Sequence, residues 1–160
     1  MGCLRFYLFI FLLSFSSVSH AACYDKREAE AEQGIRIHSE LMVIGLNCAH
    51  MADANGNNLY LEHQKFTSKH QDLFVTYEKI IMDHMRKNSK GSPEKALHSL
   101  RTKFANKISG DVAQMRPDIF CRTYAERIQK ASVMDHEALR RWAATPFPEY
   151  PVSKPLCSAE

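Results

Sequence analysis

Apolar residues recur at helical spacing along most of the chain, and no segment alternates as a half-buried strand would. In the first such segment the apolar positions step by four, three, four and three residues, a heptad-like stripe formed by Ile37, Leu41, Ile44, Cys48 and Met51. This stripe predicts a helix that begins near Tyr24 or Asp25 and ends in the turn-forming run at residues 52–58. A second stripe predicts one continuous helix over residues 59–87.

Start signals predict three further helices. Ser92 is a good N-cap and is followed by Pro93 at the first helical position, Pro117 begins the next helix, and Asp135 caps a short one over residues 136–144. Residues 146–160 are rich in proline and should lie extended on the surface. We therefore expect an all-α fold. We expect this fold to be an up-down bundle of four to five helices over residues 22–145, followed by an extended, Pro-rich C-terminal tail.

The first 21 residues have the pattern of a secretory signal peptide, in which Arg5 precedes an apolar run at residues 6–13 and small residues follow. The run is too short to anchor the chain stably in a bilayer. The sequence Ser-His-Ala at residues 19–21 predicts cleavage after Ala21, and hence a location in the periplasm or outside the cell. Acylation of Cys23 as a lipoprotein is disfavoured, because no leucine stands three residues before it.

Removal of the signal peptide leaves four cysteines, an even number that is typical of two disulfides in an oxidising compartment. Cys23 and Cys48 stand about 37 Å apart at the usual rise of a helix, so they cannot pair while the first helix is intact. An up-down arrangement brings Cys121 to the same end as Cys48, and the tail can return Cys157 to Cys23. We expect the bridges Cys48–Cys121 and Cys23–Cys157, so that Cys157 tethers the tail. The crossed pairing, Cys23–Cys121 with Cys48–Cys157, is the main alternative.

Charge is distributed unevenly along the chain. Residues 23–64 contain seven acidic and three basic residues, whereas residues 92–141 contain ten basic and six acidic ones. We expect ion pairs between an acidic first helix and basic later helices. Within the first helix Glu28, Glu30 and Glu32 lie two residues apart, so we expect them to form a solvated face. The basic residues are dispersed and lack interleaved aromatic residues, which argues against nucleic acid as a partner.

One stripe in the second predicted helix carries an unusual set of polar residues at intervals of seven. On a continuous helix His63, His70, Tyr77 and His84 would share the inward face. Buried histidines are most often ordinary core residues with a hydrogen-bond partner, and the functional alternatives are metal binding, cofactor binding and pH sensing. Two residues seven apart are about 10.5 Å apart along a helix, so no two members of this ladder can share one metal.

The best local set of metal ligands lies where the first helix ends and the second begins. His50, Met51 and Asp53 close the first helix and His63 follows at the start of the second. Imidazole, thioether and carboxylate groups suit copper or zinc in an exported protein. Exposed histidines also collect at helix ends without any function, and we regard this as the more common case.

No catalytic motif is present in the sequence. Glu-x-x-His, His-Glu-x-x-His, Gly-x-Ser-x-Gly and P-loop patterns do not occur. We therefore expect an exported helical protein that binds a protein or a small ligand and is not an enzyme, with no stable membrane span in the mature chain. The alternative is a periplasmic metal- or cofactor-binding protein that uses the His/Met positions, and an enzyme with a site assembled from scattered residues is a third hypothesis.

Overall fold

The computed structural model describes residues 23–52 and 58–158, so the predicted signal peptide lies outside the described part of the chain. Six helices form the described fold, namely α1 (Lys26–Asn47), α2 (Leu59–Lys69), α3 (Gln71–Asn88), α4 (Pro93–Gln114), α5 (Pro117–Ser132) and α6 (His136–Ala144). The β-type pairing in these residues is limited to two isolated bridges, Tyr24 with Leu156 and Ala52 with Asn58. The all-α fold is confirmed, with more helices than the four to five expected.

Local signals in the sequence place several helix starts. Asp25 and Glu28 form a capping box at the start of α1, in which each side chain accepts a hydrogen bond from the other residue's backbone N–H. Ser92 caps α4 and is followed by Pro93, and Asp135 caps α6. Such a cap contributes about 1 kcal/mol to stability. These boundaries therefore depend on a few neighbouring residues rather than on the tertiary fold.

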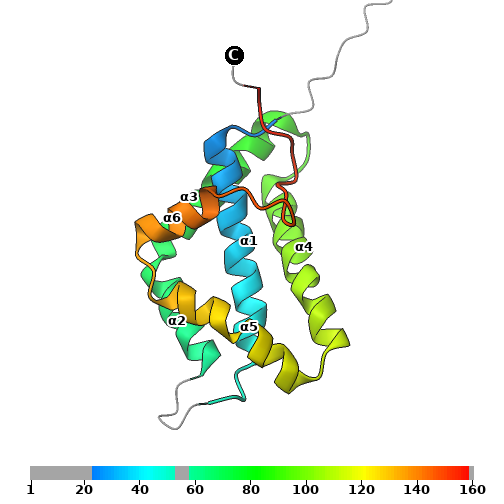
Figure 1. Ribbon diagram of the computed structural model, residues 1–160. Helices are drawn as coiled ribbons and strands as arrows, with labels where there is room; N and C mark the ends of the chain where they lie inside the picture. Colours follow the sequence, from blue (N-terminus) through cyan, green and yellow to red (C-terminus); the bar gives the residue numbers. More distant parts are fainter. Residues whose placement is uncertain (1–22, 53–57, 159–160) are drawn as a thin grey trace, which may run out of the picture.

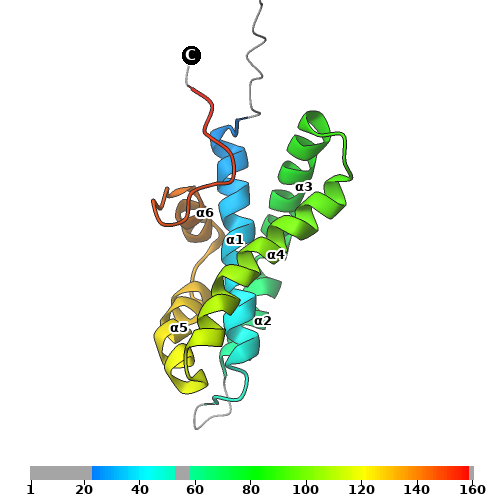
Figure 2. The ribbon, with the colours of Figure 1, turned by 90° about the vertical axis from the view of Figure 1, so that its right-hand side faces the viewer.

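Helix α1 lies at the centre, and the other five helices pack around it (Figures 1 and 2). It runs from the end that holds both termini of the described chain toward the end that holds the α4–α5 turn (Figure 1). Residues 31–37 are buried without interruption, so α1 is covered on all its faces over this stretch. A helix in this position buries its polar residues as well as its apolar stripe, and those polar residues need partners from the surrounding chain.

The predicted continuous helix over residues 59–87 is wrong, because the chain bends at His70 between α2 and α3. His70 has φ −112° and ψ 16°, and it ends one helix and begins the next. Its side chain is fully buried, and its Nε2 donates a hydrogen bond to the Met134 carbonyl at 3.2 Å, which the Lys69 ammonium also reaches. The bend lets α2 pack on α5 while α3 packs on α4. The bend places His70 against the α5–α6 turn, whose Met134 lies 64 residues away along the chain.

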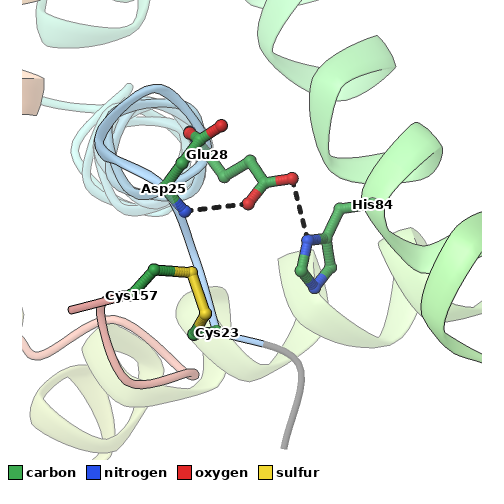
Figure 3. Close-up of a disulfide and its surroundings, with 5 residues drawn as sticks. All are labelled: Cys23, Asp25, Glu28, His84 and Cys157. Carbon is green, nitrogen blue, oxygen red and sulfur yellow. Dashed lines mark hydrogen bonds and ion pairs between the residues drawn. A yellow bond between two sulfur atoms is a disulfide. The ribbon is translucent and has the colours of Figure 1, made fainter. Parts of the chain in front are cut away.

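Both expected disulfides are present, and the crossed pairing is not. Cys48 and Cys121 are buried where α1 ends and α5 begins, with Cα atoms 5.6 Å apart. Cys23 and Cys157 join the two ends of the described chain, with Cα atoms 4.9 Å apart (Figure 3). We call residues 146–158 the strap, because this segment runs back across α1 to that second bridge (Figure 1).

The acidic residues of α1 do not form the solvated face expected from their spacing. Glu32 is only 1% exposed and lies under the strap. Its Oε1 accepts a hydrogen bond from the Ser153 backbone N–H at 2.6 Å, and its Oε2 accepts one from the Ser153 hydroxyl. The expectation was wrong because the strap and later helices cover α1 on the side where these carboxylates lie. Glu32 is therefore the position at which α1 holds the strap.

The neighbouring carboxylates of α1 are engaged by other helices. Glu30 accepts hydrogen bonds from the Tyr77 hydroxyl at 2.8 Å and from Arg140 at 3.0 Å. Glu28 Oε1 lies 2.9 Å from His84 Nδ1, next to the Cys23–Cys157 bridge (Figure 3). The expected pairing between an acidic first helix and basic later helices is present at Glu30 and Arg140.

At Gly34, α1 lies directly against the Tyr77 ring of α3. A Cβ atom at this position would lie 2.3 Å from the Tyr77 ring, far inside van der Waals contact. That ring is 3% exposed and its hydroxyl is held by Glu30, so it cannot move aside without a further loss. Glycine at residue 34 thus sets the distance between the two helices.

We predict that Gly34→Ala lowers the free energy of unfolding by about 1–3 kcal/mol, because the added methyl group overpacks the contact with Tyr77. Gly110→Ala is the matched control. A Cβ at Gly110 meets nothing within 4 Å, so the higher helix propensity of alanine should stabilise α4 by up to about 1 kcal/mol. Urea unfolding of both variants measures the difference. Equal stability of the two would contradict the Gly34–Tyr77 contact.

Candidate functional site

The structure buries the whole histidine ladder without making it one site. Exposed fractions are 7% for His63, 0% for His70, 3% for Tyr77 and 4% for His84. Each side chain has a different partner. Tyr77 and His84 contact carboxylates of α1, His70 contacts the α5–α6 turn, and His63 lies near Thr67 on its own helix. The ladder therefore joins α2 and α3 to several neighbours, as core residues do.

The predicted metal ligands are only partly covered by the structure. His50 is exposed and His63 is buried, while Asp53 lies outside the described residues. Across residues 23–52 and 58–158, no three His, Cys, Asp or Glu side chains form a group that could hold a metal ion. Copper or zinc binding by His50, Met51, Asp53 and His63 stays a prediction.

A histidine pair that the sequence did not suggest lies between α1 and α2. The rings of His38 and His63 are nearly parallel, with centroids 5.7 Å apart, and Thr67 Oγ1 lies 3.3 Å from the Nε2 atom of each. Burial, together with the charges of His63 and Arg101, lowers the pKa of His38 from 6.5 to about 4. Burial also lowers the pKa of His63. Both imidazoles are therefore neutral at pH 7, in an environment that penalises their protonation.

A cavity of about 240 Å³ lies between α1, α5, α6 and the strap. Four residues of α1 line the cavity, at positions 36, 37, 40 and 41. Residues at these positions lie on one face of a helix. The remaining walls come from one residue of α5, one of α6 and three of the strap. The lining residues are Arg36, Ile37, Glu40, Leu41, Arg127, Trp142, Phe147, Glu149 and Tyr150.

Tyr150 fixes the strap over this cavity. Its carbonyl accepts a hydrogen bond from Gln33 Nε2 at 2.6 Å, and its hydroxyl accepts one from Arg127 at 3.3 Å. The Arg36 guanidinium lies 4.5 Å and the Lys107 ammonium 3.7 Å from the centroid of the Tyr150 ring. Cations from α1, α4 and α5 thus surround one aromatic ring of the strap, an arrangement stabilised by the negative face of the ring.

Glu40 is a buried carboxylate in the cavity wall with one oxygen paired and one unpaired. Its Oε2 lies 3.0 Å from Arg36 and 3.5 Å from Arg127. Its Oε1 is buried and has no hydrogen-bond partner among the described residues. The residue as a whole is 4% exposed. A buried acceptor without a partner costs about 1–3 kcal/mol, and more when it is charged. The surrounding protein atoms cover Oε1, so this cost is part of the fold.

A wider groove between α1 and α2 is a weaker candidate. It is open, with a volume of about 900 Å³, and its rim exposes Met42, Leu46 and Leu61. The polar groups in its wall include His63 and Thr67, which already lie within hydrogen-bonding distance of each other. We therefore place the candidate site in the cavity under the strap.

Sequence reasoning did not single out the cavity residues. Its charge asymmetry did indicate pairs between α1 and later helices, and Glu40 with Arg127 is such a pair. Trp142 of α6 also lines the cavity. The signal that was missed is the spacing of Gln33, Arg36 and Glu40. These three polar residues lie on one face of α1, whereas the prediction for this helix used only its apolar stripe.

The lowered pKa values of His38, His63 and His70 make the protein less stable in acid. Unfolded histidines take up protons near pH 6.5, whereas these three stay neutral in the fold to lower pH. The stabilisation is therefore complete above pH 6.5 and is lost as the pH falls toward the folded pKa values. His38 alone should account for up to about 3 kcal/mol between pH 7 and pH 4. Urea unfolding across this range measures the loss.

The His38→Gln variant should lose less stability than the wild type over the same pH range, because it lacks the group that titrates. His98→Gln is the control, since His98 is exposed on α4. Its pH dependence should parallel that of the wild type. If His38→Gln also parallels the wild type, His38 is not held in the neutral form by its surroundings.

None of the helices in the described residues is long and apolar enough to cross a membrane. In comparisons with known proteins, no family model, no curated protein and no solved structure matches this chain.

Proposed function

We propose that this chain is an exported binding protein that holds a small molecule in the cavity under the strap. The observation that carries this proposal is the cavity itself, in whose wall the partly exposed guanidinium of Arg127 stands among apolar side chains. A ligand with a hydrogen-bond acceptor would pair with this guanidinium. The apolar walls formed by Ile37, Leu41, Trp142 and Phe147 would cover the rest of the ligand.

The strap supports a role in ligand capture. Three of the nine lining residues belong to it, and it is held by hydrogen bonds to Glu32 and Gln33 and by the bridge between Cys23 and the exposed Cys157. The opposite wall is α1. The cavity is partly open to solvent, and movement of the strap would change the width of its mouth, as loops that close over ligands do.

The composition of the cavity favours binding over catalysis. Its lining residues include no serine, threonine or cysteine that could act as a nucleophile, and its buried carboxylate, Glu40, is held in an ion pair with Arg36. Two disulfides and the N-terminal sequence pattern support export to an oxidising compartment. The resulting function is non-covalent capture of a small molecule outside the cytoplasm.

Binding can be tested with the single tryptophan of the chain, because Trp142 lines the cavity. We expect its fluorescence to change on titration with at least one member of a panel of small carboxylates, amines, amino acids, sugars and nucleosides. The same compound should raise the melting temperature, since a ligand that binds only the folded state stabilises it. If no panel member has either effect, and native mass spectrometry of the exported protein finds no bound small molecule, the proposed function is wrong.

The role of the strap can be tested with two double variants that each remove one disulfide. Cys23→Ser/Cys157→Ser releases the strap and should weaken binding of the best panel compound at least tenfold. Cys48→Ser/Cys121→Ser removes the buried bridge at the other end and should leave the affinity within about twofold at a temperature where circular dichroism shows the variant folded. An equal effect of both variants would show that the strap does not close the site.

Export predicts a defined mature terminus. When the full chain is expressed in an export-competent host, N-terminal sequencing of the product should begin at Ala22, one residue before Cys23. Mass spectrometry of the unreduced product should find no free thiols, because all four remaining cysteines are paired. An unprocessed N-terminus or free thiols would contradict export to an oxidising compartment.

A further inference from the structure

The two disulfides of the protein lie in different environments. Cys48 and Cys121 are 0% and 1% exposed, whereas Cys157 is exposed and Cys23 is half-buried. A disulfide is broken by a thiolate that attacks one of its two sulfur atoms, so the attacking thiol must be able to reach that sulfur. Of the two bridges, the one between Cys23 and Cys157 offers such a target while the bundle stays folded.

The end of the strap around Cys157 is also open to solvent. Residues 154–158 are all exposed, and Leu156 is 57% exposed although its side chain is apolar. None of the side chains in this segment belongs to the hydrophobic core. A thiol can therefore approach Cys157 without displacing packed side chains.

The bridge itself is the main contact that holds residues 154–158 against the bundle. The Tyr24 N–H donates a hydrogen bond to the Pro155 carbonyl at 2.8 Å, and the Cys157 N–H donates one to the Tyr24 carbonyl at 2.9 Å. Water replaces such hydrogen bonds when a segment leaves the bundle, so each contributes little to holding it. The covalent link to Cys23 is thus what keeps this end of the strap in place (Figure 3).

The preceding part of the strap has contacts of its own with α1. The backbone N–H and the hydroxyl of Ser153 donate to the two carboxylate oxygens of Glu32, and the Tyr150 carbonyl accepts a hydrogen bond from Gln33 at 2.6 Å. Hydrogen bonds to a charged group are stronger than those between neutral groups. Cleavage of the bridge should therefore free residues 154–158 at once and leave residues 150–153 held by noncovalent contacts, which can open and close. The protein stays folded, and the bridge can form again.

We propose that the Cys23–Cys157 bridge is a redox switch for the strap, opened at Cys157 by an external dithiol, whereas the Cys48–Cys121 bridge is a permanent link within the bundle. Exposed disulfides are typically the labile or regulatory ones, and structural disulfides resist reduction. In the open state the strap keeps only noncovalent contacts and can move away from the cavity that three of its residues line. The reaction at the bridge does not depend on whether that cavity binds a ligand.

The reaction is a two-step thiol–disulfide exchange. A thiolate of the dithiol attacks Cys157 Sγ and forms a mixed disulfide there, and the Cys23 sulfur leaves as a thiolate. The second thiol of the same molecule then attacks its own sulfur in the mixed disulfide, and the Cys157 sulfur leaves as a thiolate. The two protons of the dithiol pass through water to the two cysteines. The protein gains two electrons and two protons, and the dithiol becomes a disulfide.

The first test compares the rates at which the two bridges are reduced in the oxidised, exported protein. Dithiothreitol is the probe, and the cysteines that it frees at successive times are alkylated and assigned by mass spectrometry. Under conditions in which circular dichroism shows the protein folded, we expect Cys23 and Cys157 to be alkylated at least tenfold faster than Cys48 and Cys121. Equal rates, or faster reduction of the buried bridge, would overturn the proposal.

The second test identifies the sulfur that is attacked. Reduced glutathione has a single thiol, so its first attack leaves a mixed disulfide that can be trapped by acid and alkylation at early times. We expect molecules with glutathione on Cys157 and an alkylated Cys23 to exceed the opposite arrangement at least tenfold. If glutathione is found mainly on Cys23, Cys157 is not the site at which the switch is opened.

Hydrogen exchange measured by NMR shows whether reduction frees the strap. In the selectively reduced protein the N–H groups of Tyr24 and Cys157 should exchange at least tenfold faster than in the oxidised protein, because they lose their partners. The Cys48 N–H is the matched control, since it donates to the Ile44 carbonyl at the other end of α1 and should exchange at an unchanged rate. If Tyr24 and Cys157 stay as protected as before, the bridge does not control the strap. A failure of small-molecule binding would alter none of these three results, so the two proposals are tested separately.

Discussion

Carboxylates on a central helix that the other segments largely cover are the constraint on which this structure depends. A buried negative charge is costly unless it is paired and hydrogen-bonded, so each acidic residue of α1 requires a partner from another part of the chain. Glu28 is met by α3, Glu30 by α3 and α6, and Glu32 by the strap. Glu40 is met by Arg36 on α1 itself and by α5. The order of acids along α1 therefore specifies which segment lies beside each turn of the helix.

Glu40 differs from the other three because its pairing is incomplete. Glu32 has both oxygens engaged by Ser153, and Glu30 receives two donors at one oxygen. At Glu40 both guanidinium groups approach the same oxygen and leave the second one without a partner. The cavity occurs beside this residue. The unpaired oxygen is covered by protein atoms, so the fold itself carries the cost of leaving it without a donor.

The parts of the fold that were correctly predicted depend on contacts between neighbouring residues or on the order of residues along the chain. Caps at Asp25, Ser92 and Asp135 involve residues within three positions of one another, and the disulfide pairing follows from the order of the cysteines in an up-down bundle. The bend at His70 could not be predicted in this way, because the apolar stripe continues through it and the partner of His70 lies on the distant α5–α6 turn. The cavity combines four separate elements, so the polar spacing within α1 could indicate only one of its walls. The solvated face expected for Glu28, Glu30 and Glu32 failed for the same reason, since only tertiary packing determines that α1 is covered.

The bridge between Cys23 and Cys157 also has a mechanical consequence. It connects the first and last parts of the described chain across a Cα–Cα distance of 4.9 Å (Figure 3). Tension applied between a segment that precedes Cys23 and one that follows Cys157 would pass through this covalent link and bypass the helices between them. While the link is oxidised, the bundle cannot be pulled apart from its ends, and its resistance to stretching is that of a sulfur–sulfur bond rather than of the hydrophobic core.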